Sequence, residues 1–155
     1  MKTLTRWTRS AAAIALLAVP GHAMAQNGRE HIVLDQSPER NALPFSDAVL
    51  VGNTLYLSGY IGIDPKTNAP PASPQEETRL AMDDLERRVQ AAGMTMDDLV
   101  QVHILCTDLS LFKDFNSVYR GYFHHGYPAR TFTGSTQLLL GAHFEITGIA
   151  VKGKT

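Results

Sequence analysis

An arginine and a glutamate stand 15 positions apart near the end of the chain, each in a run typical of a β-strand. Arg130 follows Pro128-Ala129, and Glu145 lies in the run Phe144–Ala150. A planar guanidinium suits a small carboxylate ligand, and a carboxylate such as Glu145 can accept a proton. An antiparallel return of the chain could bring the two near one pocket. The same spacing is compatible with an ordinary ion pair or with two separately solvated charges.

Short motifs around these residues occur in a defined order from about Leu43 to Val151. They are Pro44-Phe45-Ser46-Asp47-Ala48-Val49, Val51-Gly52-Asn53, Leu57-Ser58-Gly59, Ile63-Asp64-Pro65-Lys66-Thr67, Ala91-Ala92-Gly93, Asn116 and Tyr127-Pro128-Ala129-Arg130-Thr131. Together they resemble the RidA/YjgF family of enamine/imine deaminases. The resemblance implies a chorismate-mutase-like α+β fold that assembles as a homotrimer, with active sites between subunits.

The resemblance also implies a division of roles. Arg130 would hold the carboxylate of a small 2-imino acid, and Glu145 would help water attack the imine carbon, so that ammonia and a 2-keto acid are released. The substrate would also be bound by five further residues, through side chains or backbone groups: Ser58, Gly59, Asn116, Phe45 and Cys106. For Ser58 and Asn116, a turn role and a helix-side hydrogen bond are equally good readings. No metal or organic cofactor is implied.

Four positions depart from the family pattern. Phe45 replaces a tyrosine, Tyr60 a glutamine, Phe132 a small residue or cysteine, and Thr147 the second acid of a Glu-x-Glu pair. The three aromatic replacements predict a drier pocket and a substrate that is smaller, differently shaped or more apolar. Phe45 and Thr147 favour an alternative, a non-enzymatic trimeric small-carboxylate-binding or chaperone-like stress protein. The retained Arg130 and Glu145 favour the deaminase.

The first 25 residues predict a Sec-type signal peptide. Lys2, Arg6 and Arg9 precede an apolar run, Ala11 to Val19, that is too short to span a bilayer comfortably, and Ala23-Met24-Ala25 suits a signal peptidase. We expect cleavage after Ala25, a periplasmic or secreted protein, and no membrane association thereafter. An uncleaved anchor is disfavoured by the short run. The expected organisation is a signal peptide at 1–25, a flexible lead-in at 26–42 and a single domain at 43–155.

Composition excludes several classes of partner. Three of the 14 basic residues fall in the predicted signal peptide, which leaves 11 basic and 15 acidic residues in the rest of the chain. Without a basic block, nothing indicates nucleic acid. Cys106 is the single cysteine and lies in an apolar run, which predicts a buried, inert thiol and no intrachain disulfide. His124-His125 has no further ligands at workable spacing, so we predict no metal site.

The local patterns predict the order β-β-α-β-α-β-β. Strands at 48–51 and 54–58 flank a Gly52-Asn53 turn, and a helix begins at Pro74, with Ser73 as N-cap and Glu76 completing a capping box, and ends at Gly93. A strand at 99–107, a helix at 111–123 and strands at 130–137 and 144–152 follow. These elements predict one mixed sheet with two helices on one face. Several strands are apolar on both sides, so self-association should bury the other face.

Overall fold

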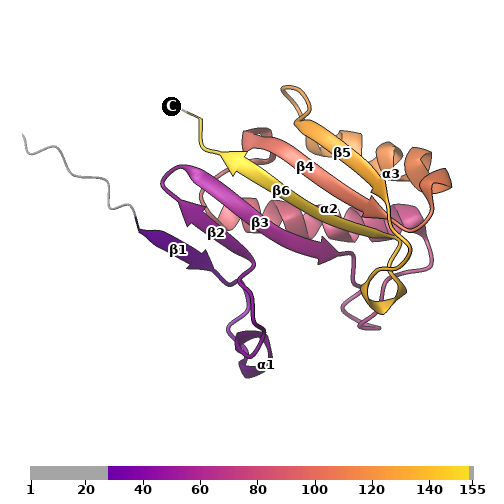
Figure 1. The fold of residues 1–155 in the computed structure, drawn as a ribbon, viewed down its shortest axis with the longest axis horizontal. Helices are drawn as coiled ribbons and strands as arrows, with labels where there is room; N and C mark the ends of the chain where they lie inside the picture. Colours follow the sequence, from indigo (N-terminus) through magenta and orange to yellow (C-terminus); the bar gives the residue numbers. More distant parts are fainter. Residues whose placement is uncertain (1–27, 154–155) are drawn as a thin grey trace, which may run out of the picture.

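The computed structural model describes residues 28–153, which form one mixed sheet and three α-helices (Figure 1). In chain order the elements are β1 (Arg29–Ile32), α1 (Pro38–Asn41), β2 (Ala48–Val51), β3 (Thr54–Ile61), α2 (Pro74–Ala91), β4 (Leu99–Cys106), α3 (Phe112–Tyr119), β5 (Ala129–Gly134) and β6 (Phe144–Val151). Short 3₁₀ turns lie at Met96–Asp98, Leu109–Leu111, Arg120–Tyr122 and Leu139–Gly141. Among these residues, no helix is long and apolar enough to cross a membrane.

The sheet runs in the order β1-β2-β3-β6-β4-β5. All neighbouring pairs are antiparallel except β4 and β5, which α3 connects as a parallel crossover. Helices α2 and α3 pack on the same face of the sheet (Figure 1). The predicted α+β class, with one mixed sheet and two helices on one face, is confirmed.

The segment before Leu43 differs from the prediction. Where the sequence predicts a flexible lead-in at 26–42, the described part, residues 28–42, contains β1, which pairs with β2, and α1, which is capped by the side chain of Ser37. The carboxylate of Asp47 holds this segment down, because it accepts the Leu34 N–H at 2.8 Å and pairs with Arg40 at 2.6 Å. The predicted signal peptide at 1–25 lies outside the described residues.

Helix α2 begins and ends where its flanking residues predict. Ser73 Oγ accepts the N–H of Glu76 at 3.3 Å, although the Glu76 side chain pairs with Arg79 and does not complete a capping box. Gly93 has φ +67°, and its N–H donates to Gln90 while that of Met94 donates to Val89, which is the Schellman ending of a helix. By contrast, α3 is shorter than predicted and ends at Tyr119, where a 3₁₀ turn takes over.

The core lies between the two helices and the sheet. Its largest fully buried apolar side chains come from both layers: Phe115, Phe144, Leu55, Met82, Leu85, Ile104, Ile146, Val89 and Val102. The alternation along β6 is strict, with Phe144 and Ile146 buried and Glu145 and Thr147 half-buried on the opposite face. The direction of each side chain on this strand is therefore fixed by its position.

A buried carboxyl group ties α2 to the start of β6. Glu77 is fully buried, and its Oε1 accepts the backbone N–H groups of His143 at 2.7 Å and Phe144 at 2.9 Å. Its Oε2 lies 2.6 Å from Nδ1 of His143. A Cβ on Gly62 would lie 2.1 Å from the carbonyl oxygen of Glu77, so only glycine permits this approach of β3 to the helix. Glu77 thereby positions the strand that carries Glu145.

A second buried network joins β2 to α2. Arg88 lies 3.2 Å from Asp47 and also pairs with Asp84, and all three residues are at most 4% exposed. Burial raises the pKa of Asp47, but the Leu34 N–H and the guanidinium groups of Arg40 and Arg88 outweigh burial, so that the pKa lies below its usual value. This network is structural, since its charges are paired within the chain.

Candidate functional site

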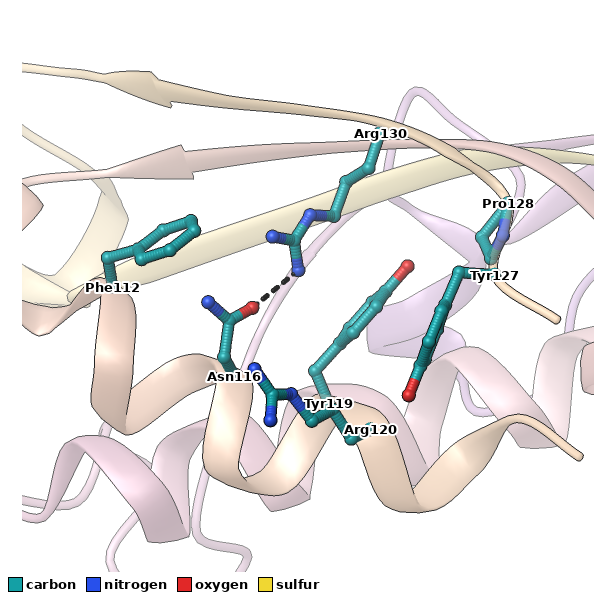
Figure 2. A pocket seen from close by; sticks show the side chains of 7 residues that line it. All are labelled: Phe112, Asn116, Tyr119, Arg120, Tyr127, Pro128 and Arg130. Carbon is teal, nitrogen blue, oxygen red and sulfur yellow. Dashed lines mark hydrogen bonds between the residues drawn. The ribbon is translucent and has the colours of Figure 1, made fainter.

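Arg130 is the second residue of the edge strand β5, and its side chain reaches toward α3 (Figure 2). Its Nη1 donates to Oδ1 of Asn116 at 2.7 Å. Arg130 and Asn116, which the resemblance separately assigns to substrate binding, are therefore in direct contact in one chain. The bond fixes one edge of the guanidinium and orients the rest of the fork.

Aromatic rings surround the guanidinium. Its central carbon lies 4.7 Å from the ring centre of Tyr119, 5.5 Å from that of Phe112 and 5.8 Å from that of Phe132. Beside it is a hollow of about 320 Å³, lined by Phe112, Asn116, Tyr119, Arg120, Tyr127, Pro128 and Arg130 (Figure 2). An arginine held on ring faces keeps its charge and loses water, which strengthens its attraction for an anion.

Within residues 28–153, Arg130 pairs with no acid, and Asn116 is its one hydrogen-bond partner. Most buried or half-buried charges in proteins find an opposite charge. The remaining donors of the Arg130 fork match the geometry of a carboxylate. The arrangement can therefore hold a small anion at the edge of the sheet.

Tyr119 forms the inner wall of this hollow. It is 2% exposed, its hydroxyl has no hydrogen-bond partner among the described residues, and burial raises its pKa to about 12 although Arg130 lowers it in part. Tyr119 is thus neutral at physiological pH. Tyr127 lies against it, with ring centres 6.4 Å apart and planes at 21°, and is 63% exposed.

Glu145 lies on the other face of the sheet. On β6 it is in register with Ile61 of β3 and Leu105 of β4. A Cβ on Gly59 would lie 2.1 Å from Oε1 of Glu145, so the carboxylate rests against the backbone of β3. Glu145 also lines a hollow of about 540 Å³ whose other walls are Leu105, Ser135, Gln137, Leu138, Leu139, Leu140 and Gly141.

Within one chain, no antiparallel pairing of their strands brings Arg130 and Glu145 together. Strand β4 lies between β5 and β6, and Arg130 aligns with Val102 while Glu145 aligns with Leu105. Two strand spacings across and three residues along the sheet place their Cα atoms about 14 Å apart. Their side chains also project from opposite faces of the sheet. Phe132 and Phe144 both contact Phe115 of α3. Arg130 is two positions from Phe132 and therefore on the helix face, whereas Glu145 is one position from Phe144 and therefore on the other face.

Ser58 and Phe45 lie in a third hollow, of about 520 Å³, together with Arg40 and Val49. The Ser58 hydroxyl donates to the carbonyl of Ser46 at 2.7 Å. Phe45 is 51% exposed, and its ring lies 4.9 Å from the Arg40 guanidinium carbon. Ser58 is adjacent in sequence to Gly59, so this hollow and the Glu145 carboxylate of β6 lie against the same part of β3.

Cys106 is buried, as predicted. Its thiol donates to the carbonyl of Asp108 at 3.0 Å, and burial raises the pKa of the thiol. Its backbone carbonyl accepts the N–H of Ser135 at 2.7 Å. The side chain therefore has the character of a core residue and not of a nucleophile.

The four departures from the family pattern occupy different places. Phe132 lies beside Arg130 in the aromatic cluster, whereas Tyr60 stacks on Arg88 with its ring centre 4.3 Å from the guanidinium carbon. The prediction that Tyr60 dries the same pocket is therefore wrong within one chain. The Thr147 hydroxyl donates to the carbonyl of Leu57 at 2.5 Å. Thr147 is thus engaged with backbone.

The sequence patterns do not identify the rings that line the Arg130 hollow. Phe112 and Tyr119 have helical spacing typical of a core, and Tyr127 gives no signal beyond its place before Pro128. A usable signal does exist. Phe112 and Tyr119 stand four residues before and three after Asn116, so they flank it on one helix face.

Comparisons with known proteins agree with this fold. The sequence model described as "Endoribonuclease L-PSP" matches residues 36–152. The chain is 40% identical over 111 residues to a RutC family protein of Sulfurisphaera tokodaii, covering 71% of this chain and 89% of that protein. It is 38% identical over 109 residues to a 2-iminobutanoate/2-iminopropanoate deaminase of Dermatophagoides farinae, covering 70% and 85%.

A solved structure of E. coli TdcF with bound serine superposes with a TM-score of 0.68 at 31% identity, covering 72% of this chain and 90% of that one. The fold thus defines an α+β protein of the YjgF type. The chain belongs to the endoribonuclease L-PSP family, also called RidA/YjgF. Relatives in this family are named as imine deaminases.

Proposed function

We propose that this protein hydrolyses 2-imino acids to 2-keto acids and ammonia, with Arg130 holding the substrate carboxylate. The observation that carries the proposal is the Arg130 guanidinium, which Asn116 orients and which pairs with no acid among residues 28–153. Relatives named 2-iminobutanoate/2-iminopropanoate deaminase act on substrates that carry such a carboxylate. A bidentate guanidinium fits this group better than a lysine would.

Glu145 is the residue proposed to activate water. Its carboxylate takes a proton from water as the water oxygen adds to the carbon of the protonated imine, which gives a neutral tetrahedral carbinolamine. That proton then passes to nitrogen, and the carboxylate takes the hydroxyl proton as the carbon–oxygen double bond forms and the carbon–nitrogen bond breaks to release ammonia. One water is consumed and no redox step occurs, so these residues need no electron acceptor.

The separation of about 14 Å between Arg130 and Glu145 supports a site formed between copies of the chain. Each site would combine Arg130 and Asn116 of one subunit with Glu145, Gly59, Ser58 and Phe45 of another. In a single chain Arg130 points toward Asn116 on α3, and Glu145 faces away from the helices. A composite site is the arrangement that lets the proposed anchor and base reach one substrate.

The open face of the sheet supports the assembly that this site requires. Tyr56 and Leu105 are 50% and 38% exposed, and they are in register with Ile149 and Glu145 of β6, on the face of the sheet that is turned away from the core. Exposed apolar patches of this kind mark interfaces. We propose a homotrimer, for which light scattering should give about three times the subunit mass.

The central test is hydrolysis itself. An amino-acid oxidase generates the imino acid in situ, and keto-acid release is followed with the purified protein. Arg130→Ala should abolish both turnover and binding of pyruvate, whereas Glu145→Gln should lower turnover about a hundredfold while pyruvate binding persists. Hydrolysis no faster than without protein would reject the deaminase and leave the small-carboxylate binder. Unchanged pyruvate binding by Arg130→Ala would reject the anchor.

A further inference from the structure

The hollow beside Arg130 is larger than a carboxylate anchor needs. In a single chain its volume is about 320 Å³, and in the proposed composite site Glu145 and Phe45 of another subunit would close its open side. Hollows of this size with ring-lined walls and a few convergent polar groups are typical of sites for larger organic ligands.

The walls specify the chemistry of what fills it. Phe112 lies on one side of the guanidinium, and Tyr119 with Tyr127 on the other (Figure 2). The polar groups, Arg130 and Asn116, are bonded to each other at one end. A ligand whose carboxylate meets Arg130 must therefore run its side chain along aromatic surface.

Tyr127 shows where a ring could dock. It is 63% exposed at the rim, while the Tyr119 ring parallel to it is 2% exposed. Another ring in offset or edge-on contact with Tyr127 or Phe112 would remove apolar surface of both partners from water. Such ring pairs contribute beyond the area that they bury.

From this geometry we infer that the protein's preferred substrates are 2-imino acids with an aromatic side chain. The inference rests on the proposed function, since it assigns the side-chain specificity of the same Arg130 site. It departs from the relatives, whose names specify the small 2-iminobutanoate and 2-iminopropanoate. Phe132, beside the guanidinium, adds apolar surface at the carboxylate end of the hollow.

Binding of stable carboxylates tests this without turnover. We would titrate the intact protein with 3-phenylpropanoate and with propanoate, which share the carboxylate and differ by the ring. We expect the first to bind about tenfold tighter or more, because the ring is partly buried against aromatic side chains. As a third probe, 3-cyclohexylpropanoate separates ring stacking from simple apolar burial and should bind between the two.

Substitutions can show whether the preference for 3-phenylpropanoate over propanoate arises in the Arg130 hollow. Tyr127→Ala should lower the ratio of the two affinities about threefold or more, with Phe112 still offering ring surface, and Tyr127→Phe should preserve the ratio. Leu109→Ala is the matched control, since Leu109 is 56% exposed and lies outside this hollow. Circular dichroism of each variant would verify that it is folded.

Each result decides between the two proposals. Equal affinity for the two probes, no binding of either, or a ratio that Tyr127→Ala leaves unchanged would overturn the inference. The protein could prefer the ring-bearing probe, weaken that preference in Tyr127→Ala, and yet hydrolyse no imino acid. That result would support the specificity of the hollow and reject only the deaminase activity. With turnover present, kcat/KM for the phenylalanine-derived imino acid should exceed that for the alanine-derived one.

Discussion

A Cβ atom placed on Gly59 would lie 2.1 Å from Oε1 of Glu145. The glycine and the glutamate come from neighbouring antiparallel strands, β3 and β6, next to the irregularity between Leu57 and Tyr60. The carboxylate of Glu145, the proposed base, thus occupies space that a side chain at position 59 would fill. The clash is with the end of a flexible side chain, so a substitution should displace the carboxylate without preventing folding.

Gly59→Ala should therefore lower kcat by about tenfold to a hundredfold, because misplacing a catalytic group by about 1 Å has effects of that size. The midpoint of urea unfolding should change little. Gly121→Ala is the control, because a Cβ at Gly121 meets nothing within 4 Å. Full activity in Gly59→Ala would show that the resting position of Glu145 is unimportant for turnover.

Asn116→Asp should impair substrate binding more than Asn116→Ala does. The new carboxylate would take the place of the amide oxygen 2.7 Å from the Arg130 guanidinium, and it would compete with the substrate for that charge. We expect KM to rise about tenfold, as a charge-assisted pair implies. Asn116→Ala removes only the hydrogen bond that orients the Arg130 guanidinium, and it adds no competing charge. If both variants gave the same KM as the wild type, Asn116 would have no part in presenting Arg130.

The Asp47 network predicts a pH-dependent loss of stability. Because the pKa of Asp47 is lowered in the folded state, its contribution is present above the unfolded pKa of about 3.9 and is lost as pH falls through the lower folded value. Asp47→Asn should cost about 3 kcal/mol in the free energy of unfolding at pH 7, since it removes the acid that pairs with Arg40 and one of the two acids that pair with the buried Arg88.

Urea unfolding at pH 7 and pH 3 measures this contribution. The difference in the free energy of unfolding between wild type and Asp47→Asn should be smaller at pH 3 than at pH 7. Glu30→Gln, a change of an exposed carboxylate on β1, should show no comparable gap at either pH. A gap that widens on acidification would contradict the assigned direction.

The predicted signal peptide makes a prediction about the mature chain. Expressed with an export system, the protein should begin at Gln26, and intact-mass spectrometry of the exported fraction would show it. Ala25→Leu should block cleavage, because signal peptidases require a small residue there. Exported wild-type protein that retains Met1 would contradict the cleavage site.

The secondary-structure elements could be predicted from neighbouring residues, whereas the arrangement of the site depends on strand pairing between distant parts of the chain. The Gly52-Asn53 turn, the Ser73 cap and the Gly93 ending each follow from the conformational needs of a few neighbouring residues. Alternation also placed Phe144 and Ile146 on the buried side of β6. Nothing in the spacing of Arg130 and Glu145 reveals that β4 pairs with both of their strands.

Two further differences have the same origin. The segment from β1 to α1 is held by Asp47, whose N–H donates to Ile32 and whose carboxylate contacts Leu34 and Arg40, and the polar composition around Pro38 does not indicate these contacts. Tyr60 lies at the β3 irregularity and faces Arg88 of α2, a partner 28 positions away. Motif order identified the family, whereas the walls of the Arg130 hollow required the packing of α3 on β5.

The carboxyl group of Glu77 affects when the chain can fold during its synthesis. Its partners, His143 and Phe144, stand 66 and 67 positions later, close to the end of the chain. A ribosome-bound chain that lacks them has a polar group on α2 that belongs in the core and has no partner there. The domain should therefore become protease-resistant in one step, only after β6 has left the exit tunnel, and ribosome-arrested chains carrying C-terminal linkers of increasing length would reveal that step.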